Sequence, residues 1–457
     1  MEALDYARSH RDDFLTELKE FLRIPSVSTQ AEHKEDVEAA ATWLRDRLLE
    51  AGFREADVMP TSGHPVVYGA WNEAGAGAPT ILVYGHYDVQ PPDPLDLWRT
   101  PPFEPTELGD DIFARGASDD KGQLYTHVKA VESYSKSEGK LPLNVKCIFE
   151  GEEESGSPSL GTFIRQHRDM LDADVAVISD SGFVRKGVPS IVYGLRGLAY
   201  LEVELTGPDH DLHSGIYGGA VLNPINALCS IMAQLQDDSR RVTVPGFYDN
   251  VRTLAPEERA ELADVPFDRE DWLEEAGVPA DWGEPGYSIF ERTTVRPTFD
   301  VNGMWGGYTE PGAKTVLPSK AFAKVSMRLV PDQDPARITR LVSEYIKEIA
   351  PQPVSVKVRA LHGARPAIVD RDSPMMEAAS LAYKEAFGKA PLLVRRGGSI
   401  PVVADLKSIL GVETILMGFG LPDDRLHSPN EKFHIPNFHQ GIETSIHFMR
   451  FLRDLSS

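Results

Sequence analysis

The sequence predicts an α/β fold in which a doubly wound catalytic domain carries an inserted two-layer α+β domain. Three short apolar runs, which begin at Ile81, Val145 and Val175, are rich in β-branched residues and bounded by turn formers. Such runs are typical of buried strands in an α/β sheet. Helical spacing of apolar residues at about 6–22 and 35–52 indicates that helices alternate with strands in this part of the chain.

The middle of the chain follows a different pattern. Leu198 to Thr206 alternates apolar and polar residues, as a half-exposed strand does, and a helix is expected at about 224–235. A strand at 321–330, a helix at 335–349 and a strand at 354–360 complete a β-α-β, β-α-β order. This order is typical of a small two-layer domain.

The α/β pattern returns near the end of the chain, with helices at about 374–387 and 437–455 and short strands near Leu392 and Thr414. A catalytic domain that is interrupted by an insertion explains this order. The predicted segments are 1–194 and 369–457 for the catalytic domain and 195–368 for the inserted domain. A polar, acidic and proline-rich stretch at 236–296 is long enough to reach either an active-site cleft or a dimer contact.

Composition excludes several classes of function. Asp and Glu number 70 against 47 Lys and Arg, which gives a net charge of −23 and disfavours nucleic acid and anionic membranes as partners. No apolar stretch approaches the roughly 18 to 20 residues of a membrane span. The acidic, amphipathic first residues are unlike a secretory signal, and Cys147 and Cys229 form no recognisable disulfide framework. We therefore expect a cytosolic protein.

Residues that can bind metal ions follow each of the three apolar runs. His86 and Asp88 follow the first run, Glu153 and Glu154 the second, and Asp180 the third. Ligands of α/β sheets bind beyond the carboxyl ends of the strands, so these side chains are expected to converge on one cleft. Carboxylates that crowd at the end of a buried strand repel one another unless cations hold them.

Each candidate also has a simpler explanation when it is taken alone. Asp119 and Asp120 precede a predicted helix, where helix capping is the favoured explanation for an acidic pair. A surface turn would explain His86, and His427 stands in a loop where an exposed histidine is common. The complete set, with two histidines and several carboxylates on one inferred rim, suits a site for two metal ions.

Four motifs resemble those of a known family. They are Gly85–Val89, Gly116–Gly122, Glu150–Gly156 and His427–Glu431, and the resemblance runs in order from about residue 10 to residue 450. The chain resembles the dinuclear metallopeptidases that include carnosine dipeptidases, cytosolic nonspecific dipeptidases, aminoacylases and succinyl-diaminopimelate desuccinylases. This resemblance implies two divalent metal ions per subunit. Zn²⁺ is the expected ion, and Mn²⁺ or Co²⁺ also suits mixed histidine and carboxylate ligands.

The resemblance also assigns roles to residues. The implied ligands are His86 and Asp180 for one ion, Glu154 and His427 for the other, and Asp119 as the bridge between them. Glu153 would be the general base, which removes a proton from a metal-bridging water, and Asp88 would support the site from beneath His86. Because Glu153 and Glu154 are neighbours, their different roles require a turn at this point, which Gly151 and Gly156 allow.

Further motifs are most similar to the dipeptidase branch of this family. They are Asp211–Gly215, Gly312–Pro318, Ser326–Pro331 and Gly397–Pro401. The resemblance implies that Arg328, Gly398 and Ser399 bind the C-terminal carboxylate of the substrate, a task that suits the planar fork of arginine. It further implies that His213, assisted by Thr315, stabilises the oxyanion across the interface of a homodimer, so that the inserted domain serves as lid and dimerisation domain.

The predicted activity is hydrolysis of the peptide bond of dipeptides or very short peptides that have a free C-terminal carboxylate. The alternative is hydrolysis of N-acyl or N-succinyl amino acids. One departure favours this alternative, because Arg395 and Arg396 stand where an acidic residue commonly precedes the Gly-Gly-Ser sequence of dipeptidases. A noncatalytic metal-binding homologue would not need Glu153, and a two-metal phosphoesterase would need more basic residues near the site.

Overall fold

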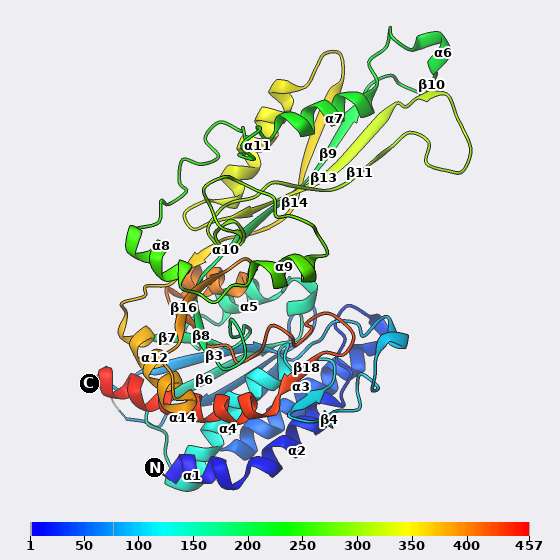
Figure 1. The fold of residues 1–457 in the computed structure, drawn as a ribbon. Coiled ribbons are helices and arrows are strands. Elements are labelled where there is room, and N and C mark those ends of the chain that lie inside the picture. Colours follow the sequence, from blue (N-terminus) through cyan, green and yellow to red (C-terminus); the bar gives the residue numbers. More distant parts are fainter. Residues whose placement is uncertain (1, 76, 457) are drawn as a thin grey trace. The chain divides into compact units, whose positions relative to one another are not determined.

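The computed structural model describes residues 2–75 and 77–456 and divides into two compact units (Figure 1). Unit 1 comprises Met1–Tyr193, Val369–Val394 and Pro401–Ser457, and unit 2 comprises Gly194–Ile368 and Arg395–Ile400. Unit 2 therefore interrupts unit 1 in the sequence. The short segment Arg395–Ile400 clusters with unit 2, although the residues on both sides of it belong to unit 1.

Unit 1 contains a mixed β-sheet, whose strands follow the order β1-β2-β6-β3-β7-β17-β8. These strands are β1 (Glu55–Met59), β2 (Val66–Trp71), β3 (Thr80–His86), β6 (Asn144–Glu150), β7 (Val175–Ile178), β8 (Ser190–Leu195) and β17 (Glu413–Leu416); β16 (Leu392–Arg396) also pairs with β8. The four central strands β6, β3, β7 and β17 run parallel to one another, whereas β2 and β8 on either side of them are antiparallel. The carboxyl ends of the four parallel strands therefore lie at the same edge of the sheet.

Helices pack against this sheet, among them α4, which contacts β3 and also α1, α2, α3 and α14. The helices of unit 1 are α1 (Glu2–Ser9), α2 (Arg11–Leu22), α3 (Lys34–Ala51), α4 (Lys121–Glu138), α5 (Leu160–Gln166), α12 (Pro374–Phe387), α13 (Pro401–Asp405) and α14 (Ile435–Leu455). A small second sheet contains β4 (Thr106–Leu108), β5 (Asp111–Phe113) and β18 (Lys432–His434). The single helix predicted at 6–22 is wrong, because the chain forms two helices that are separated at His10.

Unit 2 is a two-layer α+β domain. Its antiparallel sheet has the order β11-β13-β9-β14, and a two-stranded ribbon pairs β10 with β12. The strands are β9 (Gly197–Thr206), β10 (Leu212–His213), β11 (Asp300–Gly306), β12 (Val316–Leu317), β13 (Lys320–Leu329) and β14 (Ser355–Ala364). A further short strand, β15 (Ala367–Ile368), pairs with the end of β8 at Gly194 and Leu195. The helices are α6 (Ser214–Tyr217), α7 (Pro224–Gln234), α8 (Pro256–Ala263), α9 (Arg269–Ala276), α10 (Ile289–Thr294) and α11 (Pro335–Ile349).

The periodicity of the sequence explains the core of unit 2. Every second residue of β9 is buried, and α11 buries Ile338, Val342 and Ile346 at a spacing of four residues. A strand period of two and a helix period near 3.6 give each element one apolar face, and these faces meet in the core. The helix α11 begins where the Asp334 side chain accepts a hydrogen bond from the backbone N–H of Arg337.

The polar stretch 236–296 contains the helices α8, α9 and α10, and side chains of the stretch itself cap two of them. Asp268 caps α9, and Ser288 with Glu291 forms a reciprocal capping box at the start of α10. Within residues 2–75 and 77–456, no helix combines the length and apolarity that crossing a membrane would require.

Gly122→Ala tests the packing at the start of α4. A Cβ at this position would lie 2.0 Å from the carbonyl oxygen of Ala117 and 2.7 Å from the ring of Phe433. The backbone cannot yield easily, so we expect a loss of about 1–3 kcal/mol in the free energy of unfolding, measured by denaturant titration. Gly303→Ala is the control, since its added methyl group meets open space. Equal stability of both variants would contradict the expected clash.

Candidate metal centre

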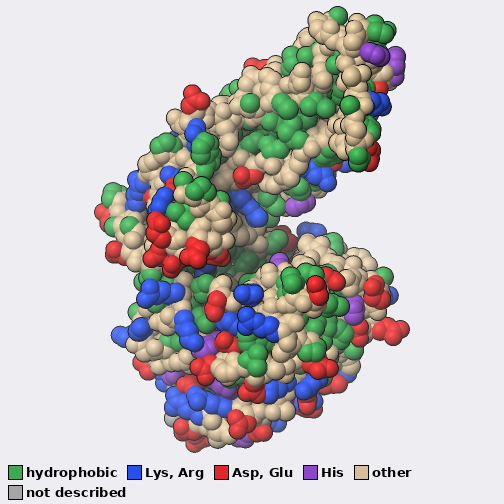
Figure 2. Space-filling view, turned by 45° about the vertical axis from the view of Figure 1, so that its right-hand side comes forward, with side chains coloured by type: hydrophobic (Ala, Val, Ile, Leu, Met, Phe, Trp, Pro, Cys, Tyr) green, Lys and Arg blue, Asp and Glu red, His purple; other side chains and the backbone are tan. Residues whose placement is uncertain are grey.

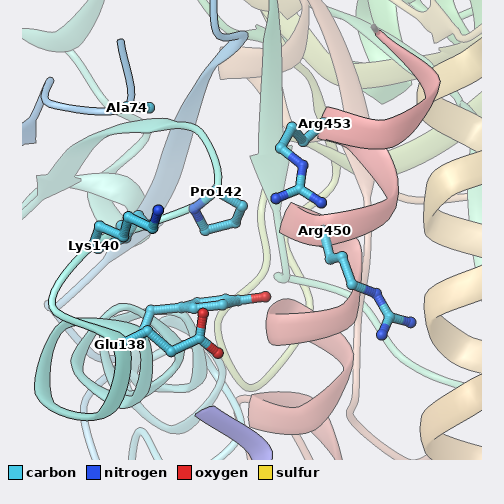
Figure 3. A pocket seen from close by; sticks show the side chains of 8 residues that line it. Ala74, Glu138, Lys140, Pro142, Arg450 and Arg453 are labelled. Atoms are coloured by element: carbon cyan, nitrogen blue, oxygen red, sulfur yellow. The ribbon is translucent and has the colours of Figure 1, made fainter. Parts of the chain in front are cut away.

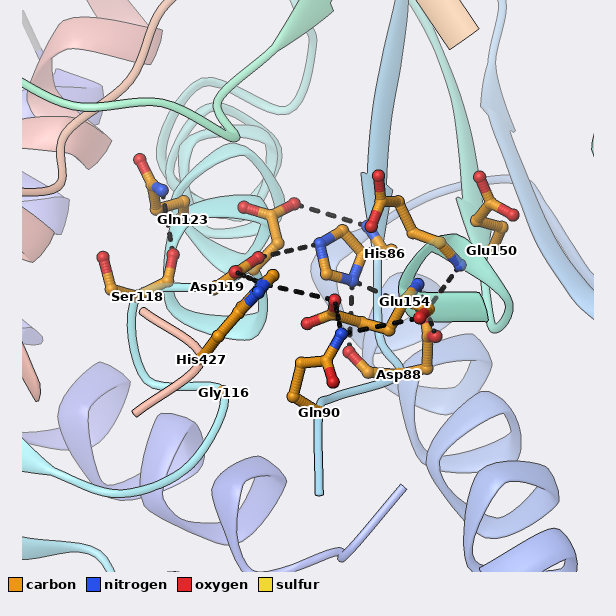
Figure 4. Close-up of polar contacts among 12 residues, drawn as sticks. His86, Asp88, Gln90, Gly116, Ser118, Asp119, Gln123, Glu150, Glu154 and His427 are labelled. Carbon is orange, nitrogen blue, oxygen red and sulfur yellow. Dashed lines mark hydrogen bonds and ion pairs between the residues drawn. The ribbon is translucent and has the colours of Figure 1, made fainter. Parts of the chain in front are cut away.

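The candidate ligands of unit 1 lie where parallel strands end. His86 is the last residue of β3, Glu150 is the last residue of the neighbouring β6, and Asp180 follows β7 by two residues. Helix α4 starts just after Asp119, and the loop that precedes β18 contributes His427. Figure 4 shows the side chains of His86, Asp119 and His427 turned toward one another from these separate segments.

Two groups of three potential metal donors share the carboxylate of Asp119. The first contains His86, Asp119 and Asp180, and the second contains Asp119, Glu154 and His427, with all donor atoms of a group within 4.8 Å of one another. One oxygen of Asp119 lies 3.0 Å from His86 Nε2, and the other lies 3.0 Å from His427 Nε2. His427 Nε2 is also 3.3 Å from Glu154 Oε2. Two divalent cations that share one carboxylate fit this donor set.

Electrostatics support a site built for positive charge. Burial, reinforced by the negative charge of Asp119, raises the pKa of Asp180 to about 7. Burial also raises the pKa of Glu153 to about 8, to which Asp180 and Glu154 contribute. The hydrogen bonds to Asp119 and Glu154 raise the pKa of His427 to about 10. Without a cation, Asp180 and His427 therefore hold protons that a metal ion would replace.

Asp88 organises the two neighbouring glutamates. Its carboxylate accepts hydrogen bonds from the backbone N–H groups of Glu153, at 3.2 Å, and Glu154, at 3.1 Å. These residues begin a 3₁₀ turn that ends at Gly156, which has a φ of +90°. The Nδ1 atom of His86 is 3.1 Å from the carbonyl oxygen of Asp88 and 3.4 Å from its carboxylate. Asp88 thus contacts both His86 and the turn that carries Glu153 and Glu154.

The capping explanation of the Asp119–Asp120 pair is wrong. Asp120 occupies the residue before α4, but its side chain makes no capping hydrogen bond. Instead, its carboxylate accepts the backbone N–H of His86 at 3.3 Å, and Asp119 faces the two histidines. Asp120 therefore contacts the end of β3, and Asp119 contacts the two candidate histidine ligands. Neither role is helix capping.

Sequence reasoning missed the importance of Glu431. This fully buried carboxylate accepts hydrogen bonds from Arg115 Nη1 at 2.7 Å and from the backbone N–H groups of Gly116, Ser118 and Asp119 at 3.0, 3.0 and 3.1 Å. Burial raises its pKa to about 7. Glu431 fixes the loop that carries Asp119 and lies four residues after His427. Its position in the His427–Glu431 motif was the one available signal in the sequence.

The remaining predicted site residues lie in unit 2, in two places. Arg328 Nη1 donates a hydrogen bond to Ser399 Oγ at 3.2 Å, and a Cβ on the adjacent Gly398 would meet nothing within 4 Å. His213 and Thr315 belong to the other place, beside the β10–β12 ribbon, where Ser214 N donates to the carbonyl of Thr315 at 3.0 Å. His213 is exposed, and its Nδ1 accepts the backbone N–H of Gly215 at 2.9 Å.

Another hollow in unit 1 has a different character. It has a volume of about 330 Å³ and lies beside the C-terminal ends of α4 and α14, where Glu138, Lys140, Arg450 and Arg453 line it (Figure 3). None of the predicted metal ligands belongs to its lining.

Comparison with known proteins identifies the family. The model of the peptidase family M20/M25/M40 matches residues 82–450, which is most of the chain. The chain belongs to this family. It is 32% identical to the Cys-Gly metallodipeptidase dug1 of Schizosaccharomyces pombe, over 98% of this chain and 96% of that protein. It is 31% identical to the human Beta-Ala-His dipeptidase, over 97% of this chain and 90% of that protein.

A solved structure extends the comparison to the fold. The M20 family metallo-carboxypeptidase Sso-CP2 from Sulfolobus solfataricus is 33% identical, with a TM-score of 0.86 over 96% of this chain and 99% of that chain. These relatives confirm the resemblance to the dipeptidase branch of a metallopeptidase family and the predicted fold, an α/β catalytic domain with an inserted α+β domain.

Glu431→Gln tests the loop that carries Asp119. We expect metal affinity to fall about 10- to 100-fold, because an amide cannot accept all the hydrogen bonds that hold the loop. Competition with a chelator of known affinity measures this change. Glu443→Gln is the matched control, since Glu443 is a buried glutamate that pairs with Arg8 and Arg11. An equal loss of metal affinity in both variants would refute a specific role for Glu431.

The metal-free protein is expected to lose stability as the pH rises from about 5 to about 8. Asp180 and Glu153 keep their protons in the folded protein at pH values where the unfolded chain has lost them. The folded state then binds more protons, so the free energy of unfolding decreases with increasing pH. Thermal unfolding of chelator-treated protein measures this trend, and Asp180→Asn should reduce its slope. A melting temperature that rises across this range would contradict the assignment.

Proposed function

We propose that this peptidase hydrolyses the peptide bond of dipeptides or very short peptides that have a free C-terminal carboxylate. The observation that carries this proposal is the pair of donor groups that share Asp119, with Glu153 beside them but in neither group. Glu153 interacts electrostatically with His86, Asp180 and Glu154. A buried carboxyl group with a raised pKa next to a metal site suits a general base.

The proposed chemistry divides between the metal ions and the protein. When bound by His86, Asp180, Glu154, His427 and the shared Asp119, two divalent ions would activate a water molecule, polarise the scissile carbonyl and keep Glu153 ionised. Glu153 then takes a proton from the water on its carboxylate and returns it to the leaving amine. The backbone N–H groups of Glu153 and Glu154 both bind the carboxylate of Asp88, which anchors the turn that carries the proposed base. Zn²⁺ is the proposed ion, and Mn²⁺ and Co²⁺ are the alternatives.

The substrate carboxylate is proposed to bind to Arg328, Gly398 and Ser399. Arg328 offers the planar donor group that suits a carboxylate, and its contact with Ser399 Oγ brings a second polar group to the same place. Gly398 leaves the space beside them open. His213, assisted by Thr315, is proposed to stabilise the oxyanion in the active site of a partner subunit, which agrees with its exposure on a short ribbon.

The names of the relatives support a substrate with a free carboxyl end. Two relatives are named for the dipeptides Cys-Gly and Beta-Ala-His, and a third is a metallo-carboxypeptidase by name. Dipeptides and carboxypeptidase substrates differ in length but share a C-terminal carboxylate. We therefore propose the carboxylate, rather than one particular side chain, as the common recognition element.

Hydrolysis of N-acyl or N-succinyl amino acids remains the second candidate. Arg396 favours it, because this partly buried cation directly precedes Gly397, and burial lowers its pKa. A cation at this position suits an acidic or acylated substrate better than a free amine. The neighbouring Arg395 contributes less to this preference, since it forms an ion pair with Glu258.

A homodimer that forms through unit 2 completes the proposal. The edge strand β11 exposes Val301, Met304 and Trp305, and hydrophobic side chains gather on the surface of unit 2 in Figure 2. An uncovered edge strand with apolar side chains is suited to pairing with another chain. We also propose a cytosolic location, which agrees with two cysteines that are both free.

Substrate panels with wild type and Glu153→Gln test the activity and the base together. We expect wild type to hydrolyse unblocked dipeptides, and the variant to lose about 10²- to 10⁴-fold in kcat, because the amide cannot accept the proton. Steady-state assays should include the N-acetylated and N-succinylated forms of each dipeptide.

The control is the metal content of Glu153→Gln, compared with that of a variant at the adjacent Glu154. Glu153→Gln should retain both metal ions, whereas Glu154→Gln should lose metal, because only Glu154 belongs to a donor group. Turnover restricted to N-acylated substrates would replace the leading proposal by the second candidate. Hydrolysis that does not depend on Glu153 would refute the mechanism.

A further inference from the structure

The stretch 236–296 lies against the loop Gly397–Ser399 within unit 2. We infer that this stretch is a scaffold for the loop and that Arg196 is the positioning residue that joins them, so that Ser399 and Arg328 can recognise a substrate carboxylate. The inference deepens the proposed function and rests on it. It also gives a role to the stretch 236–296. From the sequence alone, this stretch could reach either the active-site cleft or a dimer contact.

Arg196 connects the loop to the insertion through its guanidinium group. The residue lies between β8 and β9 and is 8% exposed. Its Nε donates a hydrogen bond to the carbonyl oxygen of Gly397 at 3.1 Å. Its Nη1 lies 3.5 Å from the carbonyl oxygens of both Arg292 and Arg296, at the end of the insertion. One planar group therefore contacts three carbonyl groups from two segments, which a single-point cation such as lysine would not reproduce.

The backbone of Arg196 holds the other end of the loop. Ser399 Oγ donates a hydrogen bond to the carbonyl oxygen of Arg196 at 2.5 Å and accepts one from Arg328 Nη1 at 3.2 Å. The orientation of the Ser399 hydroxyl group is thus determined by Arg196. A displacement of Arg196 would misplace both Ser399 and its contact with Arg328.

The carbonyl groups that Arg196 contacts belong to a rigid segment. Arg296 forms a bidentate ion pair with Glu284, at 2.7 and 3.0 Å, and Arg292 Nη1 donates to Asp281 at 2.7 Å. Arg292 Nε also donates to the carbonyl oxygen of Glu284 at 3.0 Å. Buried and bidentate contacts of this kind restrict side-chain and backbone motion. The insertion consequently presents its end to the loop in one conformation.

Two further contacts fix the start of the loop. Arg395 is 4% exposed and forms an ion pair with Glu258 on α8 of the insertion. A Cβ on Gly397 would lie 2.5 Å from the carbonyl oxygen of Thr293 and 2.9 Å from Arg196 Nη2. Glycine at this position therefore allows the insertion and Arg196 to approach the loop backbone closely.

The charges of the site agree with an anionic ligand. Burial lowers the pKa of Arg196 to about 10, and the neighbouring positive charge of Arg328 contributes. The positive charges of Arg196 and Arg328 repel each other, and a negatively charged carboxylate that binds beside them offsets this repulsion. Carbonyl oxygens engage Arg196, so Arg328 is the group that directly binds the carboxylate, and Arg196 acts through the loop.

Carboxylate selectivity in the variants Arg196→Met and Arg196→Lys tests the inference. For each protein, kcat and KM are measured with an unblocked dipeptide and with its C-terminal amide. We expect KM for the free carboxylate to rise about 10- to 100-fold in both variants, with little change for the amide, because each tenfold change needs only about 1.4 kcal/mol of lost binding. Rescue by lysine would show that charge, and not positioning, matters.

Two more variants keep the test interpretable. Glu258→Gln, on α8, should produce a smaller loss of carboxylate selectivity in the same direction, because it weakens the Arg395 contact and leaves the contacts of Arg196 intact. Arg252→Met is the control, since Arg252 lies in the same insertion but pairs with the exposed Asp332. It should retain the selectivity of wild type.

Hydrogen exchange of the peptide that covers 395–400 provides a readout without substrate. Exchange should accelerate in Arg196→Met and Glu258→Gln and remain unchanged in Arg252→Met. If wild type prefers the free carboxylate and Arg196→Met keeps both this preference and slow exchange, the inference is overturned while the proposed function stands. If wild type hydrolyses no dipeptide, the proposed function fails, and the inference about carboxylate recognition fails with it.

Discussion

The candidate metal centre of unit 1 depends on one carboxylate, that of Asp119, which two histidines share. Each oxygen of Asp119 lies 3.0 Å from a histidine nitrogen, and the other candidate ligands complete the two donor groups around it. Such a cluster is unfavourable without positive charge, because buried carboxyl groups repel one another, and burial raises the pKa of Asp180 and of Glu153. The surrounding fold has to hold these groups in place until cations bind.

Other carboxylates in the same region bind backbone N–H groups of the protein and belong to neither donor group. Asp88 accepts the N–H groups of the turn at Glu153, and Glu431 accepts those of the loop at Asp119. The distinction is physical, since a carboxylate surrounded by N–H donors is already satisfied, whereas Asp180 faces other carboxylates. In unit 2 the analogous fixing element is a cation, Arg196, which is surrounded by carbonyl oxygens.

The sequence predicted the fold class well where the signal is local. Apolar runs and helical spacing located β3, β6, β7 and α11, because each strand or helix needs one apolar face. Local reasoning was wrong for the break at His10 and for Asp120, whose carboxylate contacts the strand end at His86. It also missed Glu431, because a buried acid in a loop has no periodic pattern.

The sequence by itself determined the α/β order, the inserted position of the second domain and the types of residue offered to a metal. Only the tertiary structure decided which of these residues lie close enough to contact one another. Parallel pairing brings the ends of β3 and β6 to one edge, and Glu431 reaches the backbone of Asp119 across 312 residues. Contacts over such distances follow from packing and hydrogen bonding of the whole chain, and no local pattern encodes them.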